Sequence, residues 1–365
     1  MKNIIYLCAF AILSFGSCQT EETILGGPLI PELEPEPQVG VVDSINVELV
    51  NLQWPNPGKD YNIVDFTARL PGYIWGCIAK TNDHRELEIF SYDISSNQVQ
   101  TFTAPDTLDV PYFQIIEGSS NGKLYLHSSG VVKNKIAVFD TRSSSWSSIT
   151  LPGFVGGITI DESNDEVWIA HNNGISRVQN DSVITYDESN SALRRIISGP
   201  NNSFFGFVLA VDVSGTVWYA NSNIIYTFND EEWSVHPLSP LSDTYIVTHI
   251  VPDEIEGVLI KTPRENLLQL NASKVIKSYN AVPDLIEPAR GAINILGRSV
   301  DSSIIYSHMN GFSFYAPRKD SVFQVSAQNS NLPTLRDGLK LSRDLDDNIW
   351  IGGGNTLGIL PDEWK

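Results

Sequence analysis

Histidines are the residues of this sequence best suited to acid–base or metal chemistry, because an imidazole titrates near neutral pH and readily binds metals. The chain has six of them: His84, His127, His171, His236, His249 and His308. None of them lies in His-Glu-x-x-His or a similar ligand spacing. His127, His171 and His308 recur at the end of similar apolar segments. We therefore expect structural histidines at equivalent positions of a repeat.

Four aspartates at the same place in similar segments are candidate calcium ligands: Asp161, Asp212, Asp253 and Asp344. Each lies between two apolar strand-like segments, where an aspartate commonly bonds the backbone of its own tight turn. Asp344, Asp346 and Asp347 lack the spacing and the bidentate glutamate of an EF-hand loop. The sequence therefore predicts turn residues, no metal site and no cofactor.

Catalytic groups cannot be assigned from spacing. Cys77 follows an apolar run, and without a matched histidine base it is expected to be a buried small side chain. Carboxylate pairs for glycoside hydrolysis come from distant segments, so their spacing in the sequence does not reveal them. The sequence favours a protein that is not an enzyme and leaves catalysis open.

The charge balance excludes one class of partner. The chain carries 43 acidic and 24 basic residues, a formal net charge of −19. Binding to a phosphate backbone needs clustered lysine and arginine, which this sequence lacks. We expect no nucleic-acid partner. With 42% hydrophobic residues the chain can bury a substantial core.

The first residues predict export. A lysine, an apolar run from Ile4 to Phe15, and the small residues Gly16 and Ser17 form a signal peptide over residues 1–17. Gly16-Ser17-Cys18 resembles the lipobox of bacterial lipoproteins, which implies that Cys18 is acylated. The next residues, Gln19-Thr20-Glu21-Glu22, resemble the export signals of Bacteroidetes surface lipoproteins. This resemblance implies an outer-membrane, lipid-anchored protein at the cell surface, with the periplasmic face as the alternative.

Residues 18–44 are rich in proline and glutamate after the lipidated cysteine, so we expect an extended tether there. Beyond it, one phrase recurs: an apolar strand, a polar acidic turn, and a strand built on an aromatic or large aliphatic residue. Its anchors are Trp75, Tyr125, Trp168, Trp218, Leu259, Ile305 and Trp350. A period near 45 residues with about four short strands per unit is typical of propeller blades.

The sequence thus predicts an all-β fold, with residues 45–365 forming one seven-bladed β-propeller of four-stranded blades. The last repeat ends before its outer strand, which would leave an unpaired edge. Residues 45–52 alternate apolar and polar side chains and precede the first blade. We expect them to lie beside the last blade and close the ring.

The repeats also resemble a known family. Asn190-Ser-Ala-Leu193 and Asn329-Ser-Asn-Leu332, each followed by a strand, an acidic turn and a tryptophan strand, resemble the two-component regulator propeller repeat. His171-Asn-Asn-Gly-Ile-Ser-Arg177 continues the pattern. Such repeats form the extracellular sensor of Bacteroidetes hybrid kinases, which are thought to recognise glycan breakdown products. This sequence departs from them because it shows no transmembrane helix, kinase or receiver.

A ligand is expected on one face of the ring. In a propeller the innermost strands begin on the face where the second strands turn into the third, around a central opening. Aromatic faces with amide, imidazole and guanidinium donors suit a neutral or acidic saccharide. The predicted ligand-binding residues on this face are Tyr112, Phe154, His171, Asn172, Phe205, Asn221, Tyr245, Arg264, Arg290, His308 and Arg336.

Three functions follow as hypotheses. The leading one is a surface-anchored binding module for carbohydrate or for a partner in a nutrient-uptake assembly. The alternatives are a polysaccharide hydrolase or lyase with its active site at the central opening, and a structural accessory lipoprotein. Propeller lyases of the virginiamycin type depend on a Glu-x-His pair in one strand, which this sequence lacks.

Replacing the predicted lipid-bearing residue tests the anchor. Cys18→Ala should release the protein from the membrane fraction or leave it unprocessed, since membrane affinity comes from the buried acyl chains. Cell fractionation and the mass of the mature chain measure this. An unchanged membrane fraction together with an unchanged mass would contradict lipidation.

Overall fold

The computed structural model divides the chain into two units, residues 1–32 and 33–365. It describes residues 38–40, 47–50, 52–55, 61–80, 83–110, 113–127, 134–179, 182–194, 207–221, 224–236, 247–253, 256–261, 266–271, 275–280, 295–298, 303–308, 311–316, 321–326, 328–332 and 339–361. The predicted signal peptide, Cys18 and most of the tether lie outside these residues.

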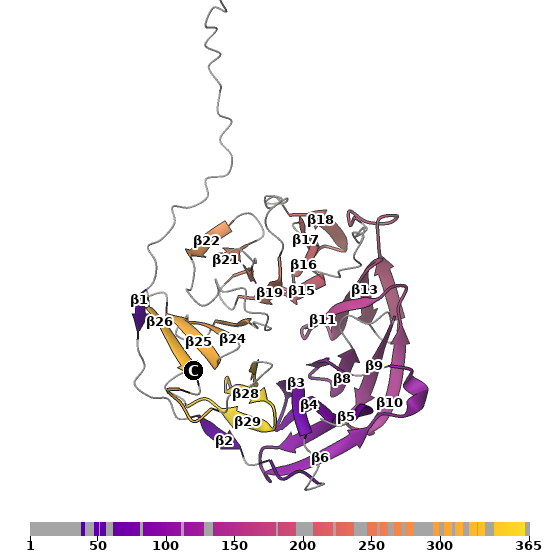
Figure 1. Ribbon diagram of the computed structural model, residues 1–365. Helices are drawn as coiled ribbons and strands as arrows, with labels where there is room; N and C mark the ends of the chain where they lie inside the picture. Colours follow the sequence, from indigo (N-terminus) through magenta and orange to yellow (C-terminus); the bar gives the residue numbers. More distant parts are fainter. Residues whose placement is uncertain are drawn as a thin grey trace, which may run out of the picture. The chain divides into compact units, whose positions relative to one another are not determined.

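The second unit consists of blades of four antiparallel strands, arranged as a ring, and one blade gains a fifth strand (Figure 1). Blade 1 comprises β3 (Tyr61–Leu70), β4 (Tyr73–Lys80), β5 (Asp83–Asp93) and β6 (Gln98–Thr103). Blade 2 comprises β7 (Ile115–Gly118), β8 (Lys123–His127), β9 (Lys135–Asp140) and β10 (Ser145–Thr150). Blade 3 comprises β11 (Val155–Asp161), β12 (Glu166–His171), β13 (Gly174–Gln179) and β14 (Ser182–Tyr186).

Four further blades complete the seven. Blade 4 comprises β15 (Phe207–Val211), β16 (Val217–Asn221), β17 (Ile224–Asn229) and β18 (Glu232–Val235). Blade 5 comprises β19 (His249–Pro252), β20 (Val258–Lys261), β21 (Asn266–Leu270) and β22 (Val275–Asn280). Blade 6 comprises β23 (Ile295–Arg298), β24 (Ile304–His308), β25 (Gly311–Ala316) and β26 (Ser321–Ser326). Blade 7 comprises β27 (Lys340–Arg343), β28 (Ile349–Gly353), β29 (Thr356–Ile359) and β2 (Glu48–Val50).

The repeat anchors predicted from the sequence all lie on the second strand of a blade, so the seven-bladed prediction is confirmed. Second strands have neighbours on both edges and both faces, which explains their apolar residues. Trp168, Trp218 and Ile305 are at most 1% exposed. Within the described residues the only helical element is the short 3-10 turn η1 (Asp106–Leu108).

The apolar residues gather between blades. Each of the seven core clusters combines side chains from two neighbouring blades. The cluster between blades 7 and 1, for example, packs Trp350 and Leu357 against Ile63 and Phe90. Burial of this apolar surface therefore requires each blade to have a neighbour on both sides, which only a closed ring provides.

The segment before the first blade closes the ring beside the last blade, as predicted. Strand β2 pairs antiparallel with β29, with Glu48 opposite Ile359 and Val50 opposite Leu357. Val47, just before β2, is 2% exposed. The side chain of Asn331 fixes it, because Asn331 Nδ2 donates to the Val47 carbonyl at 2.8 Å and Asn331 Oδ1 accepts from Val47 N at 2.9 Å.

One strand was not predicted. Residues Gln38–Gly40, inside the predicted tether, form β1 and pair in parallel with β26, which adds a fifth strand to blade 6. An outer strand presents unpaired backbone groups that any extended segment can pair with. Such pairing uses the backbone alone, so the side chains of this short segment carry no clear signal for it.

The acidic turns are built as the sequence predicted. Asp212 Oδ1 accepts from the backbone N of Ser214 and Thr216, and its Oδ2 accepts from Trp218 Nε1 at 2.7 Å. Asp344 makes the equivalent bond with Trp350 Nε1 at 2.8 Å. These aspartates therefore join each turn to the anchor tryptophan of the same blade.

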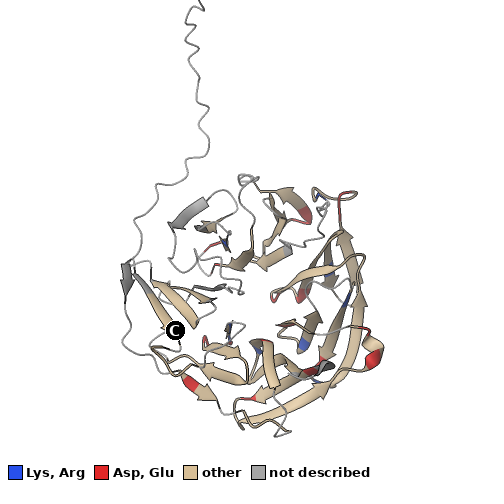
Figure 2. Cartoon of the chain, in the orientation of Figure 1, with Lys and Arg blue, Asp and Glu red and all other residues tan. Residues whose placement is uncertain are grey.

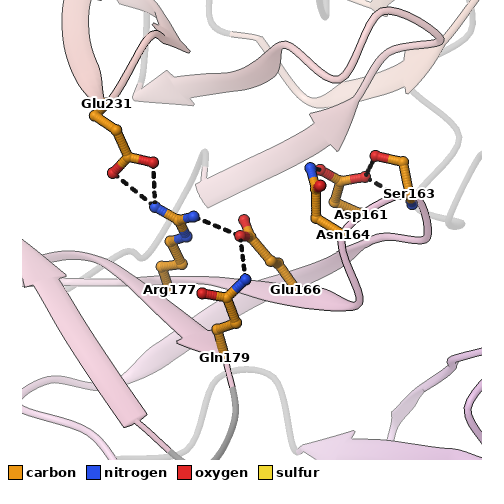
Figure 3. Close-up of polar contacts among 7 residues, drawn as sticks. All are labelled: Asp161, Ser163, Asn164, Glu166, Arg177, Gln179 and Glu231. Atoms are coloured by element: carbon orange, nitrogen blue, oxygen red, sulfur yellow. Dashed lines mark hydrogen bonds and ion pairs between the residues drawn. The ribbon is translucent and has the colours of Figure 1, made fainter.

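A polar network links blades 3 and 4 (Figure 3). Arg177 on β13 donates to Glu166 on β12 and to Glu231 in the turn between β17 and β18. Gln179 donates to the same Glu166 oxygen at 2.9 Å. Burial disfavours the charge on Arg177, but the hydrogen bonds to the two glutamates outweigh burial and raise its pKa. The guanidinium also lies 5.5 Å from the Trp168 ring, over the interface core.

Removing the closing segment tests the ring. Deletion of residues 45–52 removes the buried side chains Val47 and Leu52 and uncovers the edge of β29. Each buried aliphatic side chain contributes about 1.5–3 kcal/mol, so the free energy of unfolding should fall by several kcal/mol. Denaturant titration and the melting temperature measure the loss.

Deletion of residues 38–40 is the matched control. Blade 6 has four strands without β1, so this deletion should cost less than the first. If the variant lacking 45–52 melts at the wild-type temperature, β2 does not carry the closure.

Candidate functional site

The innermost strands surround a central cavity of about 690 Å³. Residues of β3, β7, β11, β15, β19 and β27 line it; β3, β11, β15 and β19 are labelled around the centre of the ring in Figure 1. The lining continues into the turns after β11 and β15, at Glu162 and Val213. The described part of the cavity thus reaches the face where the innermost strands end.

Five acidic residues line this cavity, and two of them, Asp65 and Glu117, lie on the innermost strands of neighbouring blades. Asp65 on β3 accepts a hydrogen bond from the backbone N of Ile116 on β7, at 3.2 Å from its Oδ2. Burial raises the pKa of Asp65, although the positive charge of Lys340 and the hydrogen bond from Ile116 oppose the rise. This carboxylate therefore joins the innermost strands of blades 1 and 2.

Glu117 on β7 is the second carboxylate. Burial raises its pKa to about 7. The positive charge of Arg69 opposes this rise, while the negative charges of Asp65 and Glu162 reinforce it. At neutral pH the Glu117 carboxyl is therefore divided between its protonated and ionised forms, so it can donate or accept a proton.

The positive groups come from blades 7 and 1. Lys340 and Arg343 lie on β27, and Arg69 lies near the end of β3. Burial lowers the pKa of Arg343, and the neighbouring charge of Arg69 acts in the same direction. His249 on β19 also lines the cavity, and burial together with Lys261 and Lys340 lowers its pKa to about 4. The imidazole is therefore neutral at neutral pH.

Both signs of charge occur on the blades around the centre of the ring (Figure 2). In the cavity the positive side chains lie on blades 7 and 1, and Glu117 and Glu162 lie on blades 2 and 3. Charged donors and acceptors form stronger hydrogen bonds than neutral ones, and a partly enclosed site strengthens them further. The arrangement is suited to holding a small, oxygen-rich polar ligand.

Four of the predicted ligand-binding residues lie at the other end of the strands. Phe154 N donates to Asn172 Oδ1 at 2.7 Å, so the start of β11 meets the turn between β12 and β13 as expected. His171 is fully buried and its Nε2 lies 3.0 Å from Ser176 Oγ. Asn221 Nδ2 donates to the Arg194 carbonyl at 3.3 Å. None of these four side chains lines the described cavity.

The other predicted residues are not brought together by the described structure. Six lie outside the described residues: Tyr112, Phe205, Tyr245, Arg264, Arg290 and Arg336. His308 ends β24, and only its backbone is described. Their part in ligand binding stays a prediction.

The sequence analysis missed Asp65, Arg69, Glu117, Lys340 and Arg343. A signal for two of them exists, because Asp65 and Glu117 each follow two apolar residues within a strand. A charge at such a position usually faces solvent or a site, since burial of an unpaired charge is costly. Convergence of the five on one cavity could not be seen, because they come from segments up to 278 residues apart.

Two negative findings concern the described residues only. No group of three or more histidine, cysteine or acidic side chains there is placed to hold a metal ion. No helix in that part of the chain is long and apolar enough to cross a membrane.

Several solved structures have a fold similar to that of this chain. No model of a protein family matches the chain, and no curated protein matches its sequence. Two similar solved structures are extracellular domains from B. thetaiotaomicron, of the proteins BT4673 and BT3049, both described as hybrid two-component systems. They share 17% identity with this chain, with TM-scores of 0.60 and 0.57 over 86% and 85% of it.

A third similar structure is YCF48 bound to D1 peptide, with 10% identity and a TM-score of 0.57. It matches over 88% of this chain and 97% of its own. The chain spans only 39% and 40% of the two B. thetaiotaomicron chains. At these identities the similarity concerns the fold, and it confirms the sequence resemblance to sensor propellers at that level.

The raised pKa of Glu117 predicts a pH effect on stability. Between pH 4.5 and about 7 the carboxyl ionises in the unfolded chain while it stays protonated in the folded one, so stability falls as pH rises. Glu117→Gln, which stays neutral, should remove this fall, worth up to about 3 kcal/mol at about 1.4 kcal/mol per pKa unit. Denaturant titrations at about pH 4 and pH 8 measure it.

The exposed residue Glu232 provides a control, because Glu232→Gln removes one negative charge far from the cavity. If the free energies of unfolding of wild type and Glu117→Gln depend on pH in the same way, the pKa of this carboxyl is not raised.

Proposed function

We propose that this chain is an exported, lipid-anchored binding protein that takes a small saccharide-like ligand into the central cavity of its propeller. Export and anchoring rest on the leader over residues 1–17 and on Cys18. The cell surface is the proposed location, because the residues after Cys18 resemble surface export signals.

The observation that carries the proposal is the charged cavity. Six innermost strands place Arg69, Lys340 and Arg343 on one side of it and Glu117 and Glu162 on another. A sugar presents many hydroxyl groups, each of which can donate to a carboxylate or accept from a guanidinium. The volume of about 690 Å³ lies within the usual range of about 300–1,000 Å³ for small-ligand sites.

The comparisons support this class of function without naming the ligand. Extracellular domains of two-component systems share the fold, which fits a propeller that meets ligands outside the cytoplasm. A partner protein in an uptake assembly is a further proposal from the sequence, and YCF48 bound to D1 peptide is a propeller of similar fold with a peptide ligand.

A second candidate is a glycoside hydrolase, favoured by Glu117. A carboxyl with a pKa of about 7 can serve as a general acid near neutral pH, and Asp65 provides a neighbouring carboxylate. This alternative predicts turnover that follows the ionisation of Glu117.

Binding and turnover measured on the same protein separate the candidates. The mature chain is titrated calorimetrically with neutral and uronic-acid oligosaccharides, and the mixtures are analysed for products. Saturable binding without products is expected. Arg343→Gln should weaken it about ten-fold, as for a lost charge-assisted hydrogen bond, while Arg194→Gln, outside the cavity, should not.

Product formation that Glu117→Gln abolishes, with binding retained, would instead establish the hydrolase. Absence of binding and of turnover across the panel would overturn both candidates and favour a structural accessory role.

A further inference from the structure

A second hollow lies between blades 1 and 2. It has a volume of about 430 Å³, within the usual range for small-ligand sites. One wall is the sheet of blade 1, and the other is formed by the turns between β7 and β8 and between β9 and β10. We call it the interblade groove; it shares no lining residue with the central cavity.

The wall on blade 1 consists of two cross-strand rows. Tyr73, Asp93 and Gln98 pair across β4, β5 and β6. Trp75, Ser91 and Gln100 form the next row. The amides of Gln98 and Gln100 are exposed and make no hydrogen bond with any described residue. This part of the sheet is polar apart from its two aromatic rings.

The groove exists because blade 2 packs only on the apolar part of this sheet. The third row contains Cys77, Ile89 and Phe102, and it joins the core with Phe139 of blade 2. Covering Gln98 and Gln100 as well would bury amides without partners, which is unfavourable. The two blades therefore separate where the rows become polar.

The opposite wall is a pair of tight turns. Thr141 Oγ1 donates to the Gly122 carbonyl at 2.8 Å. Gly122 has a φ of +86°, and a Cβ there would lie 3.0 Å from Thr141 Oγ1 and 3.3 Å from Arg142 Nε. Glycine thus lets the two turns lie close together, and Arg142 lines the groove beside them.

At the floor of this groove blade 1 lacks a hydrogen bond that blades 4 and 7 make. In blades 4 and 7 the anchor tryptophan donates its indole N–H to the turn aspartate six residues earlier. In blade 1 that position is Arg69, and Trp75 Nε1 is buried with no hydrogen-bond partner. Trp75 is 5% exposed, whereas the adjacent Tyr73, with ring centroids 6.4 Å apart, is 41% exposed.

The groups of the groove favour one ligand class. Its lining contains one negative residue, Asp93, and one positive residue, Arg142, so the groove has no net charge. Asp93 Oδ1 already accepts from Ser95 N, Ser95 Oγ and Ser96 N, so the carboxylate is engaged in its own turn. An exposed aromatic face and two exposed amides remain to contact a ligand. Sugars present an apolar face to such rings and hydroxyls to such amides.

From this geometry we propose that the interblade groove is a second binding site, for a neutral saccharide. The ligand lies against Tyr73 and bonds the amides of Gln98 and Gln100. The net charge of −19 disfavours a polyanionic ligand. The site is additional to the central cavity and stands independently of what the cavity binds.

The test titrates the mature protein with cellotetraose, maltotetraose, mannotetraose and xylotetraose. Calorimetry gives the affinity. The indole N–H signals of the eight tryptophans in an NMR spectrum show where the sugar binds. Trp75→Phe identifies the Trp75 signal. At least one tetrasaccharide is expected to bind and to shift that signal, because the sugar lies over Tyr73 and Trp75.

Variants of the exposed groups decide the site. Tyr73→Ala and Gln100→Ala should each weaken binding about ten-fold, whereas Tyr73→Phe should keep most of it, since the ring supplies the contact. Leu345→Ala is the control, an exposed apolar side chain in the equivalent turn region of blade 7. All these residues are exposed, so melting temperatures should stay near the wild-type value.

The outcomes separate the two sites. If Arg343→Gln abolishes binding while Tyr73→Ala leaves it unchanged, the groove proposal is overturned and the central cavity stands. If only the groove variants lose binding, the groove stands and the cavity does not bind that sugar. Absence of binding by all four tetrasaccharides, or preference for an aromatic peptide such as Gly-Trp-Gly, overturns the groove as a saccharide site.

Discussion

Apolar burial between neighbouring blades is the constraint on which this structure depends. Each of the seven core clusters draws its side chains from two blades, so a blade at an open end would leave one apolar face uncovered. Closing the ring satisfies every interface at once. For this reason the short strand β2, with Val47 held by Asn331, matters more than its three residues suggest.

The same local interaction reinforces blades 4 and 7, and blade 1 has a different residue at the position of its aspartate. Asp212 and Asp344 join the turn after the innermost strand to the anchor tryptophan. Blade 1 has Arg69 at the equivalent position. This one difference directs a positive side chain to the central cavity and leaves Trp75 Nε1 without a partner beside the interblade groove.

The charges in the central cavity lie on the innermost strands, two of which Asp65 itself joins through Ile116. Strand pairing and interblade packing hold the innermost strands, so burial can shift the pKa of Glu117 and His249 in opposite directions. Burial therefore favours the neutral form of both side chains. Lys340 and Arg69 oppose the shift of the carboxylates, which keeps charges of both signs in one small space. Such a space favours polar ligands over apolar ones.

The sequence by itself determined the all-β class, the seven repeats, the closing segment and the turn role of Asp212 and Asp344, because each depends on local periodicity or turn chemistry. The predicted ligand-binding face was inferred from the general topology of a propeller, and the described structure does bring Phe154 beside Asn172. Only the tertiary structure decided which charges meet. Glu117 and Arg343 are 226 residues apart, and their approach follows from the ring geometry, which no local pattern encodes. The pairing of β1 with the edge of blade 6 could not be predicted from the sequence either, since backbone hydrogen bonds require no particular side chain.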